Sequence, residues 1–262
     1  MLKGMAGVRR IVGLSLFSMM VLVGTGTVST QSLDLVTDRP DVTESATVVP
    51  RGLLQVETGY LFTRDGGVKG YEVPATLFRV GLGARTELRI GHAGVVGREG
   101  SHGAGDSTFG TKVNIIERAD GWRPELAILG GLSLPTGADG VSSDGVDPSF
   151  LVSFAHELSP RLSVGYNVGA AWESSTEQPD RDTFIAYSLA LGGGLTERLG
   201  AFLEFFGDQQ TTGVTATRGS VDGGVTFLLT DVVQLDVYVG RGLWGPTDDV
   251  FVGTGLSFRL PG

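Results

Sequence analysis

Apolar residues occupy every second position in segment after segment of this chain, and this alternation limits the fold more than any other feature. In residues 162–172 the even positions carry Leu, Val, Tyr, Val, Ala and Trp, whereas small or polar residues stand at the odd positions. A β-strand with this pattern has one apolar face and one polar face. Residues 54–62 and 233–239 alternate in a similar way. The sequence therefore predicts an all-β fold.

Twelve segments are predicted strands, and their connections alternate in length. The strands are residues 53–63, 72–82, 86–96, 107–117, 124–134, 148–158, 162–173, 183–194, 199–207, 219–229, 232–241 and 249–260. Short turns alternate with longer polar links at residues 64–70, 97–105, 136–147, 174–182, 208–218 and 242–248. Short turns at one end and long loops at the other are typical of an antiparallel transmembrane β-barrel. Twelve strands ~4.8 Å apart and tilted by ~40° leave a lumen on the order of 10 Å across between the lining side chains.

The first thirty residues differ from the rest and predict a secretory signal peptide. Lys3, Arg9 and Arg10 precede an apolar run over residues 11–23, and small residues follow to position 30. A membrane anchor is the alternative, but this run of 13 residues is shorter than the ~20 that a spanning helix needs. We expect a signal peptide over 1–30, an N-terminal segment over 31–52 and a barrel over 53–262. Export of a chain without Cys indicates the bacterial envelope, here the outer membrane.

The polar face of the predicted strands is rich in Gly, Ser and Ala and carries isolated charges of both signs. A soluble β-sandwich would present many charges to water on that face, so the pattern favours a barrel lumen. The candidate lumen-lining or ligand-contacting residues, three of them in the N-terminal segment, are Arg39, Asp41, Glu44, Glu57, Arg79, Glu87, Arg89, Lys112, Glu204, Asp222, Asp236 and Arg259. The favoured interpretation is solvated or paired charges that keep the pore wet, and dedicated ligand contacts are the alternative.

The apolar face predicts contact with outer-membrane lipids. Aromatic residues stand near strand ends, at Tyr60, Phe62, Phe109, Phe150, Trp172, Tyr187 and Phe205 toward the long loops and at Phe227 and Phe258 toward the short turns. Two interfacial girdles would place rings at those depths, and the packed core of a sandwich is the alternative. The spaced apolar residues of the last strand are the expected handle for the outer-membrane assembly machinery. Pro261 and Gly262 stand where such proteins commonly end on an aromatic residue.

Residues 31–52 lack the alternation and are predicted to enter or cover the periplasmic mouth of the barrel. Pro40 and Pro50 hold the backbone away from a helix and leave its polar groups free for side-chain partners. Arg39 would pair with a lumen carboxylate, and Asp41 or Glu44 with a lumen Arg. A free periplasmic tail is the alternative.

The sequence offers little from which to build a catalytic site. The motifs His-x-x-x-His and Gly-x-Ser-x-Gly and the phosphate loop do not occur, so we predict no enzymatic activity and no cofactor. An outer-membrane lipid hydrolase would need a Ser nucleophile beside a His. His92 and the pair Ser101 and His102, with Asp106 nearby, are the residues considered for that role.

Metal ions and nucleic acids are not expected partners. Asp139, Asp144 and Asp147 share a Gly-rich loop, but their spacing departs from that of a calcium-binding EF-hand, and turn formation explains them better. The formal net charge of -9 excludes nucleic acid, because phosphate binding needs clustered Lys and Arg.

Two blocks near the N-terminus resemble a known family. They read Asp38-Arg39-Pro40-Asp41-Val42-Thr43-Glu44-Ser45-Ala46 and Val49-Pro50-Arg51-Gly52-Leu53-Leu54-Gln55-Val56-Glu57-Thr58-Gly59-Tyr60. With shorter motifs at residues 77–82, 86–89, 105–112 and 253–259, they are similar to outer-membrane proteins named for the meta pathway of phenol degradation, whose members are often labelled transporters. The resemblance covers nearly the whole chain after residue 30. It implies an outer-membrane β-barrel that passes small or aromatic molecules, and it supplies no set of functional residues.

The sequence thus predicts an outer-membrane channel or transporter for passive diffusion of small solutes, aromatic or hydrophobic ones included. A closed structural or binding barrel without conduction is the first alternative, and a lipid hydrolase is the second. The expected partners are outer-membrane lipids, the assembly machinery and a small-molecule solute of unknown identity.

Overall fold

The computed structural model describes residues 34–260 apart from 119–120, 144, 175–180 and 214, and these residues form an all-β structure. The strands are β1 (Leu54–Asp65), β2 (Val68–Gly81), β3 (Thr86–His92), β4 (Val95–Arg98), β5 (Ser101–Ala104), β6 (Ser107–Ile116), β7 (Glu125–Leu134), β8 (Asp147–Ser159), β9 (Leu162–Glu173), β10 (Asp182–Gly194), β11 (Leu199–Gln210), β12 (Thr217–Thr230), β13 (Val233–Trp244) and β14 (Val250–Leu260). Within this described part, no helix is long and apolar enough to cross a membrane. The predicted signal peptide lies outside it.

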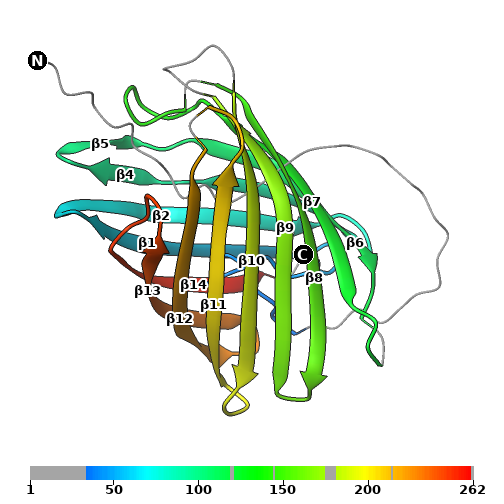
Figure 1. The fold of residues 1–262 in the computed structure, drawn as a ribbon. Helices are drawn as coiled ribbons and strands as arrows, with labels where there is room; N and C mark the ends of the chain where they lie inside the picture. Colours follow the sequence, from blue (N-terminus) through cyan, green and yellow to red (C-terminus); the bar gives the residue numbers. More distant parts are fainter. Residues whose placement is uncertain (1–33, 119–120, 144, 175–180, 214, 261–262) are drawn as a thin grey trace, which may run out of the picture.

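The strands close into one antiparallel barrel. From β6 to β14 each strand pairs with the next, and β1 completes the wall by pairing with β14 on one side and β2 on the other. β3 pairs directly with β6, because β4 and β5 form a hairpin beside β2 that projects from the wall (Figure 1). Twelve strands make up the closed wall, which confirms the predicted twelve-stranded barrel.

The predicted long link at residues 64–70 is wrong. β1 runs to Asp65 and β2 begins at Val68, so Gly66 and Gly67 alone connect them. Both glycines have positive φ, 54° and 94°, as a two-residue hairpin turn requires. The polar, glycine-rich composition of this stretch marks a turn correctly but does not determine its length.

The predicted loop at residues 97–105 and the predicted uninterrupted strand over 86–96 are also wrong. The strand stops at His92 and resumes as β4, which turns into β5 within the predicted loop. Gly94, with φ of 72°, permits the interruption. The N–H of Gly105 donates to the carbonyl of Gly94 across it at 2.8 Å, so the ladder continues past the irregularity.

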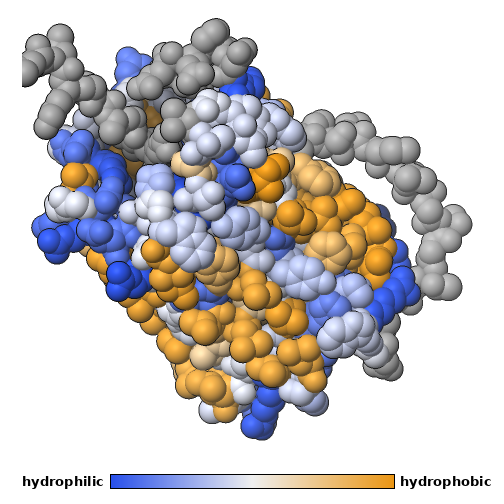
Figure 2. Space-filling view, viewed as in Figure 1, coloured by the Kyte–Doolittle hydropathy of each residue, from blue (hydrophilic) through white to orange (hydrophobic). Residues whose placement is uncertain are grey.

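The alternation places one face of the strands outward and the other inward, as the sequence predicts. On β13, Leu235, Val237 and Val239 are 41%, 47% and 55% exposed, whereas Asp236 between them is 4% exposed. Figure 2 shows apolar residues gathered over the barrel wall that faces the viewer, with polar residues toward the ends. This outer wall has the apolar band that a barrel presents to lipid.

The lumen is filled in part by residues 34–52, which lie inside the barrel without regular secondary structure. We call this stretch the lumen segment. Ala46 of the segment packs against Ala127, Leu129 and Leu151 of the wall in a small buried apolar cluster. Because that cluster is small, polar contacts carry most of the attachment of the segment to the wall.

Candidate functional site

The lumen segment forms a loop that enters and leaves at the short-turn end of the barrel. At its start, Arg259 Nη1 donates to the carbonyl of Asp34 at 3.0 Å. At its end, the N–H of Gly52 donates to the carbonyl of Gly81 at 2.9 Å. Between these points the tip of the segment, residues 41–44, reaches Glu204 in the middle of β11. The segment is therefore anchored at both ends and projects its tip into the lumen.

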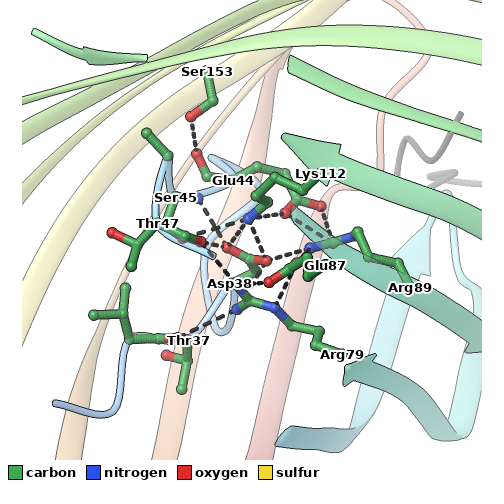
Figure 3. A network of polar contacts seen from close by, with 12 residues as sticks. Thr37, Asp38, Glu44, Ser45, Thr47, Arg79, Glu87, Arg89, Lys112 and Ser153 are labelled. Atoms are coloured by element: carbon green, nitrogen blue, oxygen red, sulfur yellow. Dashed lines mark hydrogen bonds and ion pairs between the residues drawn. The ribbon is translucent and has the colours of Figure 1, made fainter. Parts of the chain in front are cut away.

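Asp38 is the centre of a buried charge network, which we call the Asp38 network (Figure 3). Its carboxylate accepts a hydrogen bond from Lys112 Nζ at 2.7 Å, forms an ion pair with Arg79 at 3.0 Å and contacts Arg89. The three cations come from β6, β2 and β3, which are neighbours in the wall. Burial alone would raise the pKa of Asp38, but Arg79, Lys112 and Arg89 lower it well below its ordinary value. Asp38 therefore stays ionised and ties the segment to three strands.

Two wall carboxylates complete the Asp38 network. Glu57 and Glu87 each bond to Arg79 at 2.9 Å. Each also accepts a backbone N–H of the lumen segment, Glu57 from Asp38 at 3.0 Å and Glu87 from Val49 at 2.7 Å. Buried charges are tolerated when they are paired and their remaining hydrogen-bonding capacity is used. This side of the lumen meets that condition except at Arg89 Nε, which is buried without a hydrogen-bond partner.

Arg39 lies in a seat made by three adjacent strands. Its guanidinium donates to both carboxylate oxygens of Asp236 at 3.3 and 3.1 Å. Gly59 on β1 and Gly255 on β14 pair with each other, and Asp236 on β13 pairs with Gly255. A Cβ atom at Gly59 or Gly255 would lie 2.6 or 2.3 Å from atoms of the Arg39 guanidinium. Glycine at both positions therefore lets the guanidinium rest directly against the wall.

The tip of the lumen segment is held by acceptors from the opposite strands. Glu204 accepts the backbone N–H groups of Val42 and Thr43, both at 2.7 Å, and also the hydroxyl of Thr43. The N–H of Glu44 donates to Asn167 Oδ1 at 2.7 Å. Charge-assisted bonds to backbone N–H groups are about twice as strong as neutral ones, so Glu204 is the principal attachment of the tip.

Three carboxyl groups meet at the tip, and we call Asp41, Glu204 and Asp222 the tip acids. Glu204 and Asp222 stand directly opposite each other on β11 and β12. Burial, followed by the negative charges of Glu204 and Asp222, raises the pKa of Asp41 well above its ordinary value. Like charges in directly opposite positions destabilise a sheet. The tip acids thus differ in character from the compensated Asp38 network.

A cavity of about 850 Å³ lies between the lumen segment and the wall at the short-turn end. Small residues of β8 to β11 line it, including Ala155, Ser163, Gly165, Ala190, Gly192 and Ala201. Arg118, Arg123 and Arg161 stand at its rim. Because small side chains project little into the lumen, this side retains space beside the segment.

The structure brings most of the sequence-predicted residues together in groups. Glu44, Glu57, Arg79, Glu87, Arg89 and Lys112 belong to the Asp38 network, Asp41, Glu204 and Asp222 are the tip acids, Arg39 lies on Asp236, and Arg259 bonds to Gln55. Arg79, Glu87 and Lys112 are 0% exposed and Glu57 is 1% exposed. These four charges are paired with one another or with Asp38, and the lumen segment covers them.

Sequence reasoning missed several residues that the site uses. Asp38 stands in the N-terminal block that resembles the family. It lies outside the predicted strands, so no alternation pattern predicts its position or its partners. Asn167, Phe206 and Phe251 face inward, and their strand phase alone could have placed them in the lumen. A period of two assigns a face, but it does not say which lumen residue meets the segment.

The structure places the two histidines considered for catalysis on different strands. His92 Nδ1, at the end of β3, accepts the backbone N–H of Gly94 at 2.7 Å, and His102 is exposed beside Ser101 on β5. Asp106 accepts two backbone N–H groups of the loop after β7, at 2.9 and 3.0 Å, so it holds that loop in place. No group of three His, Cys, Asp or Glu residues suited to a metal ion occurs among the residues with described positions. Asp144, of the calcium candidate, lies outside them.

Comparison with known proteins supports the sequence resemblance. The model of a family described as "Putative MetA-pathway of phenol degradation" matches residues 37–260. None of the curated proteins compared with the chain matches it.

Three solved outer-membrane proteins share the fold. An outer membrane channel from Pseudomonas putida F1 superposes with a TM-score of 0.65 at 15% identity, covering 81% of this chain and 97% of that one. The NanC porin gives 0.54 at 12% identity, covering 79% and 100%, and the KdgM porin gives 0.52 at 11%, covering 78% and 98%. At such identities the likeness shows the fold of an outer-membrane β-barrel.

Proposed function

This chain belongs to the MetA-pathway phenol-degradation family, and on that premise we propose that it is an outer-membrane channel for passive diffusion of small solutes, closed at rest by its lumen segment. The observation that carries the proposal is the position of that segment. Its tip crosses to Glu204 of β11 while Asp38 is bound to β2, β3 and β6. A barrel whose lumen is crossed by a segment of the same polypeptide conducts when that segment moves aside.

The cavity supports a solute path beside the lumen segment. Its volume of about 850 Å³ lies along the small-residue wall and beside the tip, so release of the tip enlarges a space that already exists. The bore expected for twelve strands limits the solute to small molecules. Aromatic or hydrophobic solutes suit the family description and the inward aromatic residues Phe206 and Phe251.

The orientation of the channel follows from the unequal ends of the barrel. Outer-membrane barrels have short periplasmic turns and longer external loops, so the short-turn end, with the entrance of the lumen segment and the cavity, faces the periplasm. A signal peptide over residues 1–30 directs export, and β14 engages the assembly machinery. The outer wall is in contact with membrane lipids.

Single-channel recording in planar bilayers tests the channel function. Deleting residues 31–48 should raise conductance severalfold, because both the Asp38 attachment and the tip are removed. Heat-modifiable migration on gels checks that the variant barrel is folded. Unchanged conductance in a folded deletion variant would refute occlusion by the lumen segment.

A matched variant restrains the segment instead of removing it. The hydroxyl oxygens of Thr43 and Ser188 lie 2.8 Å apart, and the chain contains no Cys, so T43C/S188C introduces one cross-link between tip and wall. Oxidation should suppress channel openings, and reduction should restore them. If the cross-linking variant shows no channel openings in either redox state and the deletion variant does not conduct either, a closed structural barrel is favoured. The buried Asp38 network supports that alternative.

A further inference from the structure

The pair formed by Glu204 and Asp222 is the least compensated feature of the lumen. The two residues are directly opposed on β11 and β12, and both side chains are buried. Two ionised carboxylates both accept hydrogen bonds and cannot donate one. A hydrogen bond between two carboxyl groups placed in this way therefore requires a proton on one of them.

The charged groups around the pair do not replace that proton. On β12, Arg218 pairs with Asp208 of β11 at 2.8 Å. On the lumen segment, Arg39 pairs with Asp236 of β13 at 3.1 Å. The remaining titratable groups that act on the pair are acidic or neutral, namely Asp41 of the segment and Tyr238 of β13. The residues paired with Glu204 on β10 and with Asp222 on β13, Ala190 and Gly240, carry no charge.

Aromatic packing keeps the pair dry. Asp222 is 3% exposed, and its Oδ1 has no hydrogen-bond partner. The rings of Phe206 and Phe251 pack edge to face at 5.9 Å. A Cβ atom at Gly240 would lie 2.2 Å from Phe251 Cζ and 2.5 Å from Asp222 Cβ, so the Phe251 ring is a neighbour of the carboxyl group. A second negative charge in such surroundings would be strongly disfavoured.

We propose that Glu204 and Asp222 share one proton and act as a latch: with the proton present Glu204 holds the tip of the lumen segment, and its loss at alkaline pH releases the tip. This inference rests on the proposed function, because it regulates the same segment. Glu204 uses its ionised form to accept the N–H groups of Val42 and Thr43. Protonated Asp222 donates to Glu204. When Asp222 ionises, repulsion displaces Glu204 from the tip.

Asp41 acts in the same direction. In the released segment Asp41 ionises near its ordinary pKa, whereas in the docked segment its pKa is raised well above that value. Docking therefore favours the protonated form and weakens as pH rises from the ordinary pKa toward the raised one. The two effects differ in location, so substitutions at Asp41 and Asp222 separate them.

A nitroxide label at the tip measures release without reference to conduction. Val42 is 43% exposed, so V42C in this Cys-free chain accepts the label with little disturbance. In the folded full-length barrel in liposomes, label mobility should be low at pH 6 and severalfold higher at pH 9. D222N should lose the part of the pH response that Asp222 causes, because the Asn amide donates to Glu204 without titrating, and D41N/D222N should keep the label immobile at both pH values. E204Q should be mobile at both.

Matched variants isolate the proton of Asp222 as the cause of release. D208N, on the same strand as Glu204 but paired with Arg218, should retain the full pH response. D41N should retain the part of the pH response of label mobility that Asp222 causes. Equal mobility at pH 6 and 9 in the V42C parent, or a pH response in D222N as large as that of the parent, would overturn the latch. Release by EDTA at pH 6 would also overturn it, because a bound cation would then hold the pair. Failure of the deletion variant to conduct refutes the channel but leaves these mobility results intact.

Discussion

Two neighbouring parts of the lumen segment, Asp38 and the tip, meet the barrel wall in opposite ways. Asp38 is surrounded by Arg79, Arg89 and Lys112, and every one of these charges is buried and compensated. Three residues later, Asp41 precedes Val42 and Thr43, whose N–H groups bind Glu204, and the negative charges of Glu204 and Asp222 raise its pKa. Burial stabilises the first arrangement through pairing and makes the second sensitive to protonation.

This contrast assigns different tasks to the two regions. The Asp38 network attaches the lumen segment to β2, β3 and β6, where charged side chains fill the lumen. The tip lies on the side of the small residues and the cavity, where space is available for movement. A segment with one firm and one conditional attachment can release its tip while it remains bound to the barrel.

The largest expected effect comes from neutralising Asp38. Asp38→Asn leaves the three buried cations with one carboxylate fewer, and breaking a buried pair in this way costs roughly 3 to 5 kcal/mol. We expect loss of hydrogen-exchange protection throughout residues 34–52 and a raised conductance. Hydrogen exchange with mass spectrometry measures the first and planar-bilayer recording the second.

Asp41→Asn is the matched variant of Asp38→Asn, three positions along the same segment. Because it removes a negative charge from among the tip acids, protection of the tip at pH 7 should stay equal or increase. Similar loss of protection in both variants would contradict the distinction between the two regions.

An intermediate effect is expected for Arg39, which links the two regions. Arg39→Ala removes two hydrogen bonds to buried Asp236, and hydrogen bonds to charged groups contribute about 1.5 to 3 kcal/mol each. Single-channel traces should show brief openings, fewer than in Asp38→Asn. Gly255→Ala should act similarly, because its Cβ would lie 2.3 Å from Arg39 Nε. Arg39→Lys restores the charge without the two-pronged geometry, so full recovery by Lys would argue against the seat on Gly59 and Gly255.

Substitutions in the small-residue wall of the cavity should have the smallest effect on folding but a clear effect on conductance. Gly192→Phe places a ring in the cavity, and a Cβ atom there has Ser163 Oγ at 3.2 Å as its nearest neighbour. In the background lacking residues 31–48, conductance should fall with the barrel still folded. Leu191→Phe, at the 44% exposed adjacent position, should leave conductance unchanged. Equal reductions in the two variants would place the solute path elsewhere.

Much of the barrel was determined by the sequence itself, because the period of two is a local property. It identified Val237 as outward and Asp236 as inward, and it located the wall strands to within a few residues. It also predicted a pairing of Arg39 with a lumen carboxylate. The sequence predicted the lengths of the connections less accurately than the strands, as the two-residue turn at Gly66 and Gly67 shows. The composition of a turn does not determine where strand pairing stops.

Only the tertiary structure decided which charges meet. Arg39 and Asp236 are 197 residues apart in the chain, and Thr43 and Glu204 are 161 apart. No spacing along the chain relates such partners, because closure of the barrel and the path of the lumen segment bring them together. The same closure surrounds Asp38 with cations and places Asp41 against Glu204 and Asp222. The sequence therefore determined which residue types line the lumen, whereas barrel closure decided which carboxylates are neutralised by cations and which depend on a proton.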